Sequence, residues 1–312
     1  MAVFVRLLNP LLMILLGLGA GVAVARLLRD PWRLYGIGAW TFILSQVLHI
    51  PFNAWVLQPL LEDLVPRGPV LGTGLLIYAL ALGLSAGVFE EPARWLAFRM
   101  ALRSRRWHDA LALGAGHGGI EAVLVGVLAL YTVIQLLAVQ GPGAAEQLSP
   151  AQLEALGGAE SQIAAFWAAP WYGVLLGALE RLFAICFHLS ASVLVLQAFR
   201  RGNLLWVALA VLWHAVFNAA AVYTAAAWGP YWAEAVLGAG ALIALGIVYA
   251  LREPPADASP PAAPAQPLAF DRRGPSAEEI EGSRYGEVSR ETLFINGSVS
   301  FSGKSLISKA HP

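Results

Sequence analysis

The sequence predicts an all-α fold: a polytopic transmembrane helical bundle of about seven spans, with a disordered C-terminal tail. Composition is the first reason, since 58% of the 312 residues are hydrophobic, 13% are charged and the mean hydropathy is +0.64. Soluble domains carry roughly 25% charged residues. The second reason is that apolar stretches long enough to cross a bilayer recur throughout residues 1–252. A soluble core could not bury that much apolar surface.

Seven charge-poor windows supply the predicted spans, because a membrane-crossing helix needs about 20 predominantly apolar residues. No linker separates the windows, so residues 1–252 are predicted to form one membrane-embedded helical domain. The first window is interpreted as a retained helix, because it ends in a basic cluster without an Ala-x-Ala-like cleavage site. The windows are Val3–Ala25, Leu34–Leu60, Val70–Glu90, Ala110–Val139, Ala165–Phe199, Leu204–Trp228 and Trp232–Leu251.

Basic residues fall in alternate connections between these windows, and the remaining connections are acidic or neutral on balance. Short loops rich in Lys and Arg stay in the cytoplasm. The pattern therefore predicts an integral membrane protein, in what we expect to be a bacterial cytoplasmic membrane, with its N-terminus outside and its C-terminus in the cytoplasm. The basic residues are Arg26, Arg29, Arg33, Arg99, Arg103, Arg105, Arg106, Arg200, Arg201 and Arg252.

The C-terminal segment 253–312 differs from the rest of the chain in composition. Its Pro/Ala-rich run at residues 259–267 is typical of an extended linker and has no capacity to bury a core. The segment is therefore predicted to be a disordered cytoplasmic tail.

Several functional classes can be excluded. The net charge is zero and the basic residues form no single face, so nucleic acid is not an expected partner. The Gly-rich run 114–119 lies inside an apolar window with no strand before it, so no nucleotide is expected. Residues 83–87 match Gly-x-Ser-x-Gly, but a serine nucleophile in that motif needs a strand-to-helix turn. Here the motif lies within a predicted membrane helix, so a serine nucleophile is not expected. Cys186 is the single cysteine, which leaves no intrachain disulfide.

Ionisable side chains inside the predicted spans are the candidate functional residues, because charge is costly in hydrocarbon. Counted from the basic clusters at 1.5 Å per helical residue, Glu90, Glu91, His117, His188 and His214 all lie about 13–20 Å along their helices. That depth is near the middle of a ~30 Å hydrocarbon core. The set therefore has the character of a site, although any one of these side chains could instead serve only to hydrogen-bond helices together.

Spacing along each helix adds partners to this set. Residues four apart lie on the same helix face, and three such pairs occur. Small residues beside them permit close approach between membrane helices. The pairs are His117 with Glu121, His214 with Asn218, and Glu90 with Arg94.

Other polar residues are interpreted as structural or solvated. His49 lies further toward the outer side and is expected to have a structural role. Glu180 and Arg181 lie further out still and could pair as a structural bridge. His108 and Asp109 belong to the cytoplasmic end and are expected to be solvated.

A carboxylate and several imidazoles in a membrane cavity suit the activation of water, either on a metal or by direct general-base catalysis. Hydrolysis of a peptide bond within the membrane needs such a water together with a donor for the oxyanion. Asn218 or a histidine could be that donor. The sequence contains no His-Glu-x-x-His zinc-protease motif.

The order of these motifs resembles one family. Phe-Glu-Glu-Pro-Ala-Arg at residues 89–94 looks like the Glu-Glu-x-x-Arg motif of the YhfC group of intramembrane metalloproteases, relatives of PrsW and of the CAAX-prenyl-protease and bacteriocin-processing (CPBP, Abi) family. Three motifs follow in the same order: Gly-His-Gly-Gly-Ile-Glu-Ala around His117, Phe-His-Leu-Ser around His188, and Trp-His-Ala-Val-Phe-Asn from Trp213. The resemblance covers residues 34–251.

The resemblance implies a membrane-embedded peptidase that acts on a membrane protein or peptide within the lipid bilayer. Zinc is a possible cofactor, with His117, His188 and His214 as its implied ligands, and a metal-free glutamate mechanism stays open. The arginine spacing is closer to that of PrsW than to that of the prenyl-protease branch, so prenylated substrates are not implied. The implied roles are water activation by Glu90 or Glu91 beside His117, metal binding or oxyanion stabilisation by His188, His214 and Asn218, and support from Arg94 and Glu121.

Two other classes of function are compatible with buried Glu and His residues. A proton-coupled transporter would place them at mid-membrane, but it would ordinarily show broken helices in internally repeated halves. A non-catalytic membrane binding protein of the same fold would retain the cluster without the chemistry. Haem binding would use the histidines as axial ligands but would leave Glu90 and Glu91 unexplained, so no haem is expected.

Overall fold

The computed structural model describes residues 2–27, 31–64, 72–102, 105–138 and 163–253. All regular secondary structure in these ranges is helical, which confirms the predicted all-α class. Met1–Pro254 forms one compact unit. Apart from Glu253, the predicted disordered tail lies outside the described residues.

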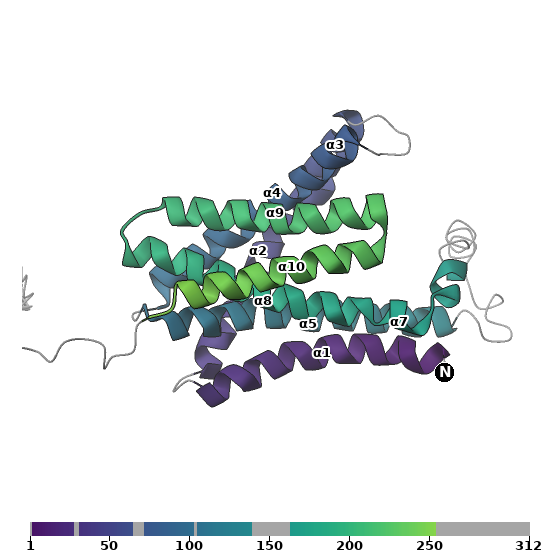
Figure 1. Cartoon of the computed structure of the whole chain (residues 1–312), viewed down its shortest axis with the longest axis horizontal. Helices are drawn as coiled ribbons and strands as arrows, with labels where there is room; N and C mark the ends of the chain where they lie inside the picture. The colour runs from purple at the N-terminus through teal and green to yellow at the C-terminus, as the bar shows by residue number, and fades with distance from the viewer. Residues whose placement is uncertain (1, 28–30, 65–71, 103–104, 139–162, 254–312) are drawn as a thin grey trace, which may run out of the picture. The chain divides into compact units, whose positions relative to one another are not determined.

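The long helices follow one another along the chain and mostly run beside one another (Figure 1). Six of them are long and apolar enough to cross a membrane: α1, α4, α5, α8, α9 and α10. α2 has the length, but Ser45, Gln46 and His49 lower its apolarity. The prediction of about seven spans is consistent with these six helices together with α2. The bounds are α1 Ala2–Leu27, α2 Pro31–Phe52, π-helix η1 Asn53–Leu57, α3 Gln58–Leu64, α4 Thr73–Met100, α5 Trp107–Ala138, α7 Trp171–Val174, α8 Leu176–Arg200, α9 Leu205–Trp228 and α10 Pro230–Ala250.

α8 is the central helix of the bundle. In its apolar window 72% of the residues are buried, compared with 39% or less in the other candidate spans. It packs against α5, α9 and α10, while α4 packs mainly against α9, and α5 packs against α1 and α2 (Figure 1). Residues on α4, α5, α8 and α9 can therefore meet inside the protein.

Two of the predicted windows differ from the structure near the candidate residues. The window that was expected to end at Glu90 continues as α4 to Met100, through Pro92, and this continuation places Glu91 and Arg94 on one helix, where they pair inside the bundle. The window Ala165–Phe199 is interrupted at Pro170, since a proline has no N–H for a helical hydrogen bond and disfavours helix at the residue before it.

Glycines let the helices around α5 approach closely, as the small residues predicted. A side chain at Gly38 of α2 would collide with the Leu113 carbonyl, and one at Gly116 of α5 would collide with the Tyr35 carbonyl. Backbones approach this closely only where the side chain is a hydrogen atom. These contacts fix α2 against the part of α5 that carries His117.

The basic connections gather at one end of the bundle. Arg33 donates to the Ala101 carbonyl, the Arg105 guanidinium lies over the Phe199 ring, and Arg200 pairs with Glu253. These contacts join the ends of α2, α4, α8 and α10. The alternation along the sequence is therefore matched by a common location in space.

Asp109, at this same end, was expected to be solvated, and that expectation is wrong. Its side chain is 1% exposed and accepts hydrogen bonds from the backbone N–H and the guanidinium of Arg106. The hydrogen bond with this carboxylate raises the pKa of Arg106. An acidic residue in the first turn also favours the start of α5, because it interacts with the positive end of the helix dipole.

We predict that Gly38→Ala destabilises the protein by about 1–3 kcal/mol, because the methyl group would force α2 away from α5. Gly36→Ala is the matched control on the same helix, since an added methyl there meets nothing within 4 Å, and we expect it to be neutral or slightly stabilising. Thermal unfolding in detergent measures both. Equal stability of the two variants would contradict the packing argument.

We predict that the end of the bundle carrying the basic connections faces the cytoplasm. In a Cys186→Ala background, a membrane-impermeant thiol reagent applied to intact cells should label Asp63→Cys, at the opposite end, and should not label Arg201→Cys. Both positions are exposed. Labelling of Arg201→Cys in intact cells would reverse the orientation.

Candidate functional site

The predicted polar residues meet at a cluster built around two adjacent glutamates of α4. Glu91 and Arg94 are both 0% exposed, and Arg94 Nε lies 3.1 Å from Glu91 Oε2. On the other side of the carboxylate, His214 Nδ1 of α9 lies 2.8 Å from Glu91 Oε1. Glu91 is therefore held between a guanidinium and an imidazole.

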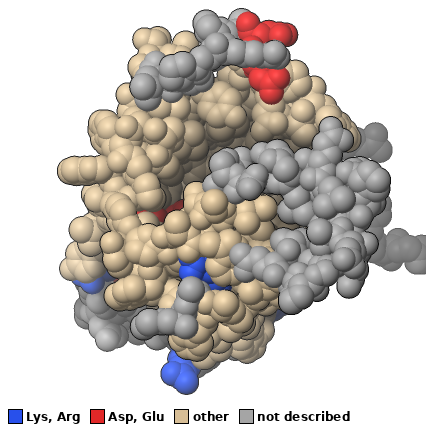
Figure 2. Space-filling model, turned by 90° about the vertical axis from the view of Figure 1, so that its right-hand side faces the viewer, with Lys and Arg blue, Asp and Glu red and all other residues tan. Residues whose placement is uncertain are grey.

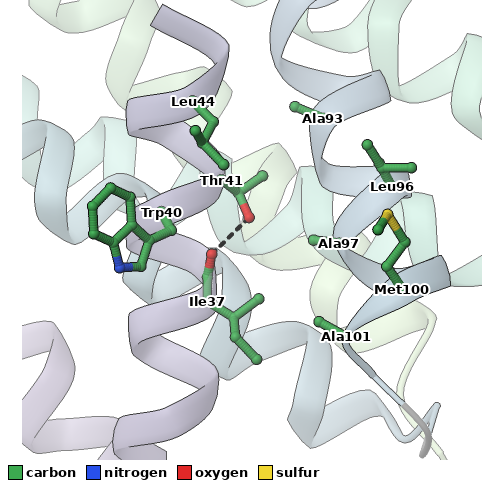
Figure 3. Close-up of a pocket in the computed structure, with 9 residues that line it drawn as sticks. All are labelled: Ile37, Trp40, Thr41, Leu44, Ala93, Leu96, Ala97, Met100 and Ala101. Atoms are coloured by element: carbon green, nitrogen blue, oxygen red, sulfur yellow. Dashed lines mark hydrogen bonds between the residues drawn. The ribbon is translucent and has the colours of Figure 1, made fainter. Parts of the chain in front are cut away.

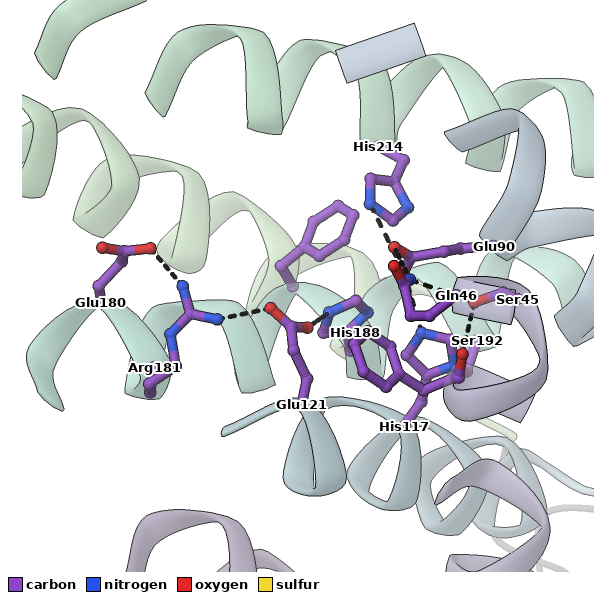
Figure 4. Close-up of polar contacts among 12 residues, drawn as sticks. Ser45, Gln46, Glu90, His117, Glu121, Glu180, Arg181, His188, Ser192 and His214 are labelled. Atoms are coloured by element: carbon purple, nitrogen blue, oxygen red, sulfur yellow. Dashed lines mark hydrogen bonds and ion pairs between the residues drawn. The ribbon is translucent and has the colours of Figure 1, made fainter. Parts of the chain in front are cut away.

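Glu90 is oriented by residues from three other helices (Figure 4). His117 Nε2 of α5 lies 3.0 Å from Glu90 Oε2, and His214 Nε2 lies 3.8 Å from the same oxygen. Gln46 Nε2 of α2 donates to Glu90 Oε1 at 3.1 Å. Gln46 was not among the predicted site residues, because an uncharged amide carries no signal comparable to that of an ionisable residue in a membrane span.

Arg94 also connects this cluster to the central helix. One of its Nη atoms donates to the His188 carbonyl at 3.0 Å and to Ser192 Oγ at 2.6 Å, and the other donates to His188 Nδ1 at 3.1 Å. His188 Nδ1 must therefore accept, which places the ring proton on Nε2. That nitrogen lies 2.6 Å from Glu121 Oε2.

A second cluster of charged residues extends from Glu121 away from the end of the bundle that carries the basic connections. Arg181 lies 2.5 Å from Glu121 Oε1 and also contacts Glu180 (Figure 4). Glu180 and Arg181 thus form the bridge that the sequence suggested, and Glu121 joins it to His188. Helical spacing placed Glu121 on the face of His117, but its partners are on α8.

A polar cavity of about 70 Å³ borders these groups. A water needs about 10–15 Å³ of such space and two to four polar partners, so the cavity can hold water. Figure 2 views the end of the molecule at which α1 begins and shows a hollow with the red of Asp or Glu residues inside it. The polar residues that line the cavity include Asn218, as predicted from its spacing to His214. The full set is Glu90, Glu121, Glu180, Arg181, His188, His214 and Asn218.

A second hollow has a different character. The groove between α2 and α4 has a volume of about 280 Å³ and an almost wholly apolar lining (Figure 3). Trp40 and Met100 on its walls are 62% and 77% exposed, as expected of side chains that face lipid. Because the groove contains no ionisable side chain, the chemistry belongs to the polar cavity.

Three side chains could hold a metal ion. One ligand atom each from Glu90, His117 and His188 lies within 4.8 Å of the others, and carboxylate plus imidazole is a donor set that zinc accepts. His117 Nδ1 is buried without a hydrogen-bond partner, and a metal ion or a water could supply the partner that this nitrogen lacks. Both ring nitrogens of His188 already have partners, Arg94 at Nδ1 and Glu121 at Nε2. His188 could therefore bind a metal only if one of these two contacts were broken. His214, also a predicted ligand, lies outside this group of three.

The fold and this cluster define a polytopic α-helical membrane protein with buried glutamates and histidines arranged around a polar cavity. The family model for YhfC intramembrane metalloproteases matches residues 12–237, and the chain belongs to that family, as its motifs predicted. A curated relative is the uncharacterized membrane protein YhfC of Bacillus subtilis (strain 168). It is 34% identical over 194 residues, which cover 61% of this chain and 72% of the relative. No solved structure matches the chain significantly.

We predict that Arg94→Met lowers the free energy of unfolding by about 3–5 kcal/mol, because it leaves Glu91 as a buried charge without its ionic partner. The double variant Glu91→Gln/Arg94→Met should recover part of that loss. Arg99→Met, at an exposed position on the same helix, is the control and should cost about 1 kcal/mol or less. Unfolding in detergent measures all three, and equal losses for Arg94→Met and Arg99→Met would contradict the pairing.

Proposed function

We propose that this protein is an intramembrane peptidase that hydrolyses peptide bonds of membrane-associated proteins or peptides. The observation that carries the proposal is the buried cluster of Glu90, Glu91, Arg94, His117 and His214 beside a polar cavity large enough for water. Charged groups inside a membrane protein are costly and usually mark function. The family's description as intramembrane metalloproteases supports the same chemistry.

Of the two glutamates, Glu90 is the better candidate for the general base. It lines the polar cavity and its Oε2 faces His117 and His214. Glu91 is fully buried, and both of its oxygens are occupied by Arg94 and His214. We therefore assign Glu91 to holding His214, so that the Nε2 of that ring is directed toward Glu90.

In the proposed reaction, Glu90 carries one proton from the attacking water to the leaving nitrogen. Glu90 Oε2 takes a proton from water as the water oxygen forms a bond to the scissile carbonyl carbon. The resulting oxyanion accepts a hydrogen bond from the Asn218 amide, which lines the same cavity. His214 Nε2 could donate to it only when both nitrogens of that ring carry protons, because Nδ1 already donates to Glu91. When the C–N bond breaks, Glu90 returns the proton to the leaving amine nitrogen. A carboxylic acid is thus formed on one product and an amine on the other.

A bound metal would use Glu90 as a ligand instead of as the general base. Glu90, His117 and His188 are the residues that would hold it, and when bound it would lower the pKa of a water ligand and polarise the substrate carbonyl. In either case Arg94 would position Glu91 and His188 through the contacts it makes with both.

A proton-coupled transporter is less well supported than a peptidase. Pro92, next to Glu91, is a position where a transporter helix could be broken, but α4 is continuous from Thr73 to Met100. A binding protein that kept the cluster without catalysis is the remaining alternative, and activity measurements distinguish it.

The test is proteolysis by purified protein in detergent against a panel of membrane-peptide substrates, together with metal content per chain. Glu90→Gln should reduce cleavage by about 100-fold or more, because a general base contributes about 10²–10⁴ in rate. His214→Asn and Glu91→Gln should also reduce it. Glu62→Gln, at an exposed residue of α3 outside the site, is the matched control and should retain wild-type activity.

Two results would contradict the proposal. Undiminished cleavage by folded Glu90→Gln would remove Glu90 from the reaction. Failure of the wild-type protein to cleave any substrate, with no bound metal, would favour the transporter or the binding protein.

A further inference from the structure

A chain of hydrogen bonds connects Glu90 to residues of α2, η1 and α4 that the proposed reaction does not use. Gln46 Nε2 donates to Glu90 Oε1, and Gln46 Oε1 lies 3.3 Å from His49 Nδ1. His49 Nε2 lies 3.0 Å from Asn53 Nδ2. Ser85 Oγ donates to Asn53 Oδ1 at 2.6 Å. The chain therefore runs without a gap from Ser85 to the candidate base.

The orientation of the Gln46 amide follows from its neighbours. Ser45 Oγ donates its hydrogen to the Phe42 carbonyl, so it can only accept from Gln46 Nε2, 3.3 Å away. A Glu90 carboxylate likewise only accepts. Both hydrogens of the Gln46 amide nitrogen are therefore used, and Gln46 Oε1 is the atom that faces His49.

This orientation determines the tautomer of His49. A carbonyl oxygen only accepts and an amide nitrogen only donates, so His49 Nδ1 must carry the proton that bonds to Gln46, and Nε2 must accept from Asn53. One neutral tautomer, with hydrogen on Nδ1, satisfies both contacts. Every donor between Ser85 and Gln46 then points along the chain toward Glu90.

The fold holds His49 and Asn53 in place. His49 is 8% exposed, and its ring stacks on Phe89, the neighbour of Glu90, with 5.3 Å between ring centroids. Asn53 opens the π-helix η1, in which Gln58 N–H bonds to the Asn53 carbonyl five residues earlier. Single π-helical turns often occur at functional sites.

We infer that Gln46, His49 and Asn53 are positioning residues that fix Glu90 Oε1 and leave Oε2 as the oxygen that meets the reacting water. The geometry carries this inference, because the two oxygens of Glu90 have different partners: Gln46 on one side, His117 and His214 on the other. The part that concerns water rests on the proposed peptidase function. His49, which the sequence suggested to be structural, gains a role through Gln46.

Two substitutions at His49 separate positioning from packing. His49→Gln keeps one donor and one acceptor and can preserve the order of the chain, but it loses the aromatic stack. His49→Phe keeps the stack on Phe89 and loses both nitrogens. A packing role predicts that Phe is tolerated better than Gln, whereas a positioning role predicts the opposite.

The first measurement needs no substrate. Nitrogen NMR of histidine-labelled protein in detergent, with the His49 signals assigned by their loss in His49→Gln, should show a protonated Nδ1 and an unprotonated Nε2. In Gln46→Leu the Nδ1 chemical shift should change, because the acceptor for its hydrogen is gone, while Asn53 still donates to Nε2. A proton on Nε2 in the wild-type protein, or an Nδ1 shift that does not respond to Gln46→Leu, would overturn the chain.

The second measurement tests the role of the chain in peptide hydrolysis. Relative to wild type, His49→Phe and Gln46→Leu should lower kcat by about 10–100-fold, the range seen when outer partners of site residues are removed, with KM changed less than about twofold. His49→Gln should stay within about threefold of wild type. Wild-type kcat in His49→Phe would overturn the positioning role. A wild-type protein without activity but with the expected His49 tautomer would overturn the peptidase proposal and the water-directed role, leaving only the hydrogen-bond chain.

Discussion

The buried guanidinium of Arg94 is the interaction on which the rest of the site depends. It is fully buried in a helix that crosses the bundle, where an unpaired charge would cost several kcal/mol. Glu91, the His188 carbonyl and Ser192 surround it. Because α8 is the most buried helix, Arg94 joins the candidate glutamates to the centre of the protein.

Each of the three clustered histidines has a carboxylate beside it. His117 faces Glu90, His214 faces Glu91 and His188 faces Glu121. Each of these carboxylates thus has an imidazole partner across α4, α5, α8 and α9, and the cluster can remain inside an apolar bundle. The same pairing leaves few free atoms, and His117 Nδ1 is one of them, so the arrangement limits where water or a metal could bind.

Residue spacing predicted which side chains reach the site, because the helical rise fixes the depth of each residue once a span is recognised. Glu90, Glu91, His117, His188 and His214 were found this way, and Asn218 was found by its four-residue spacing from His214. Spacing did not predict partners. Arg94 shares a helix face with Glu90 by the i,i+4 rule yet pairs with Glu91, and Glu121 pairs across to α8. Gln46 and the tautomer of His49 gave no signal in the sequence at all.

By itself, the sequence determined that the chain forms apolar helices with basic connections at alternate turns, since length, hydropathy and charge are properties of each segment alone. It also predicted a common depth for the polar residues. Only the tertiary structure decided which of them meet. The rotation of each helix about its axis depends on the neighbour against which it packs, as where Gly38 and Gly116 admit a backbone of the adjacent helix. A hydrogen bond between two helices is fixed only when both rotations are fixed.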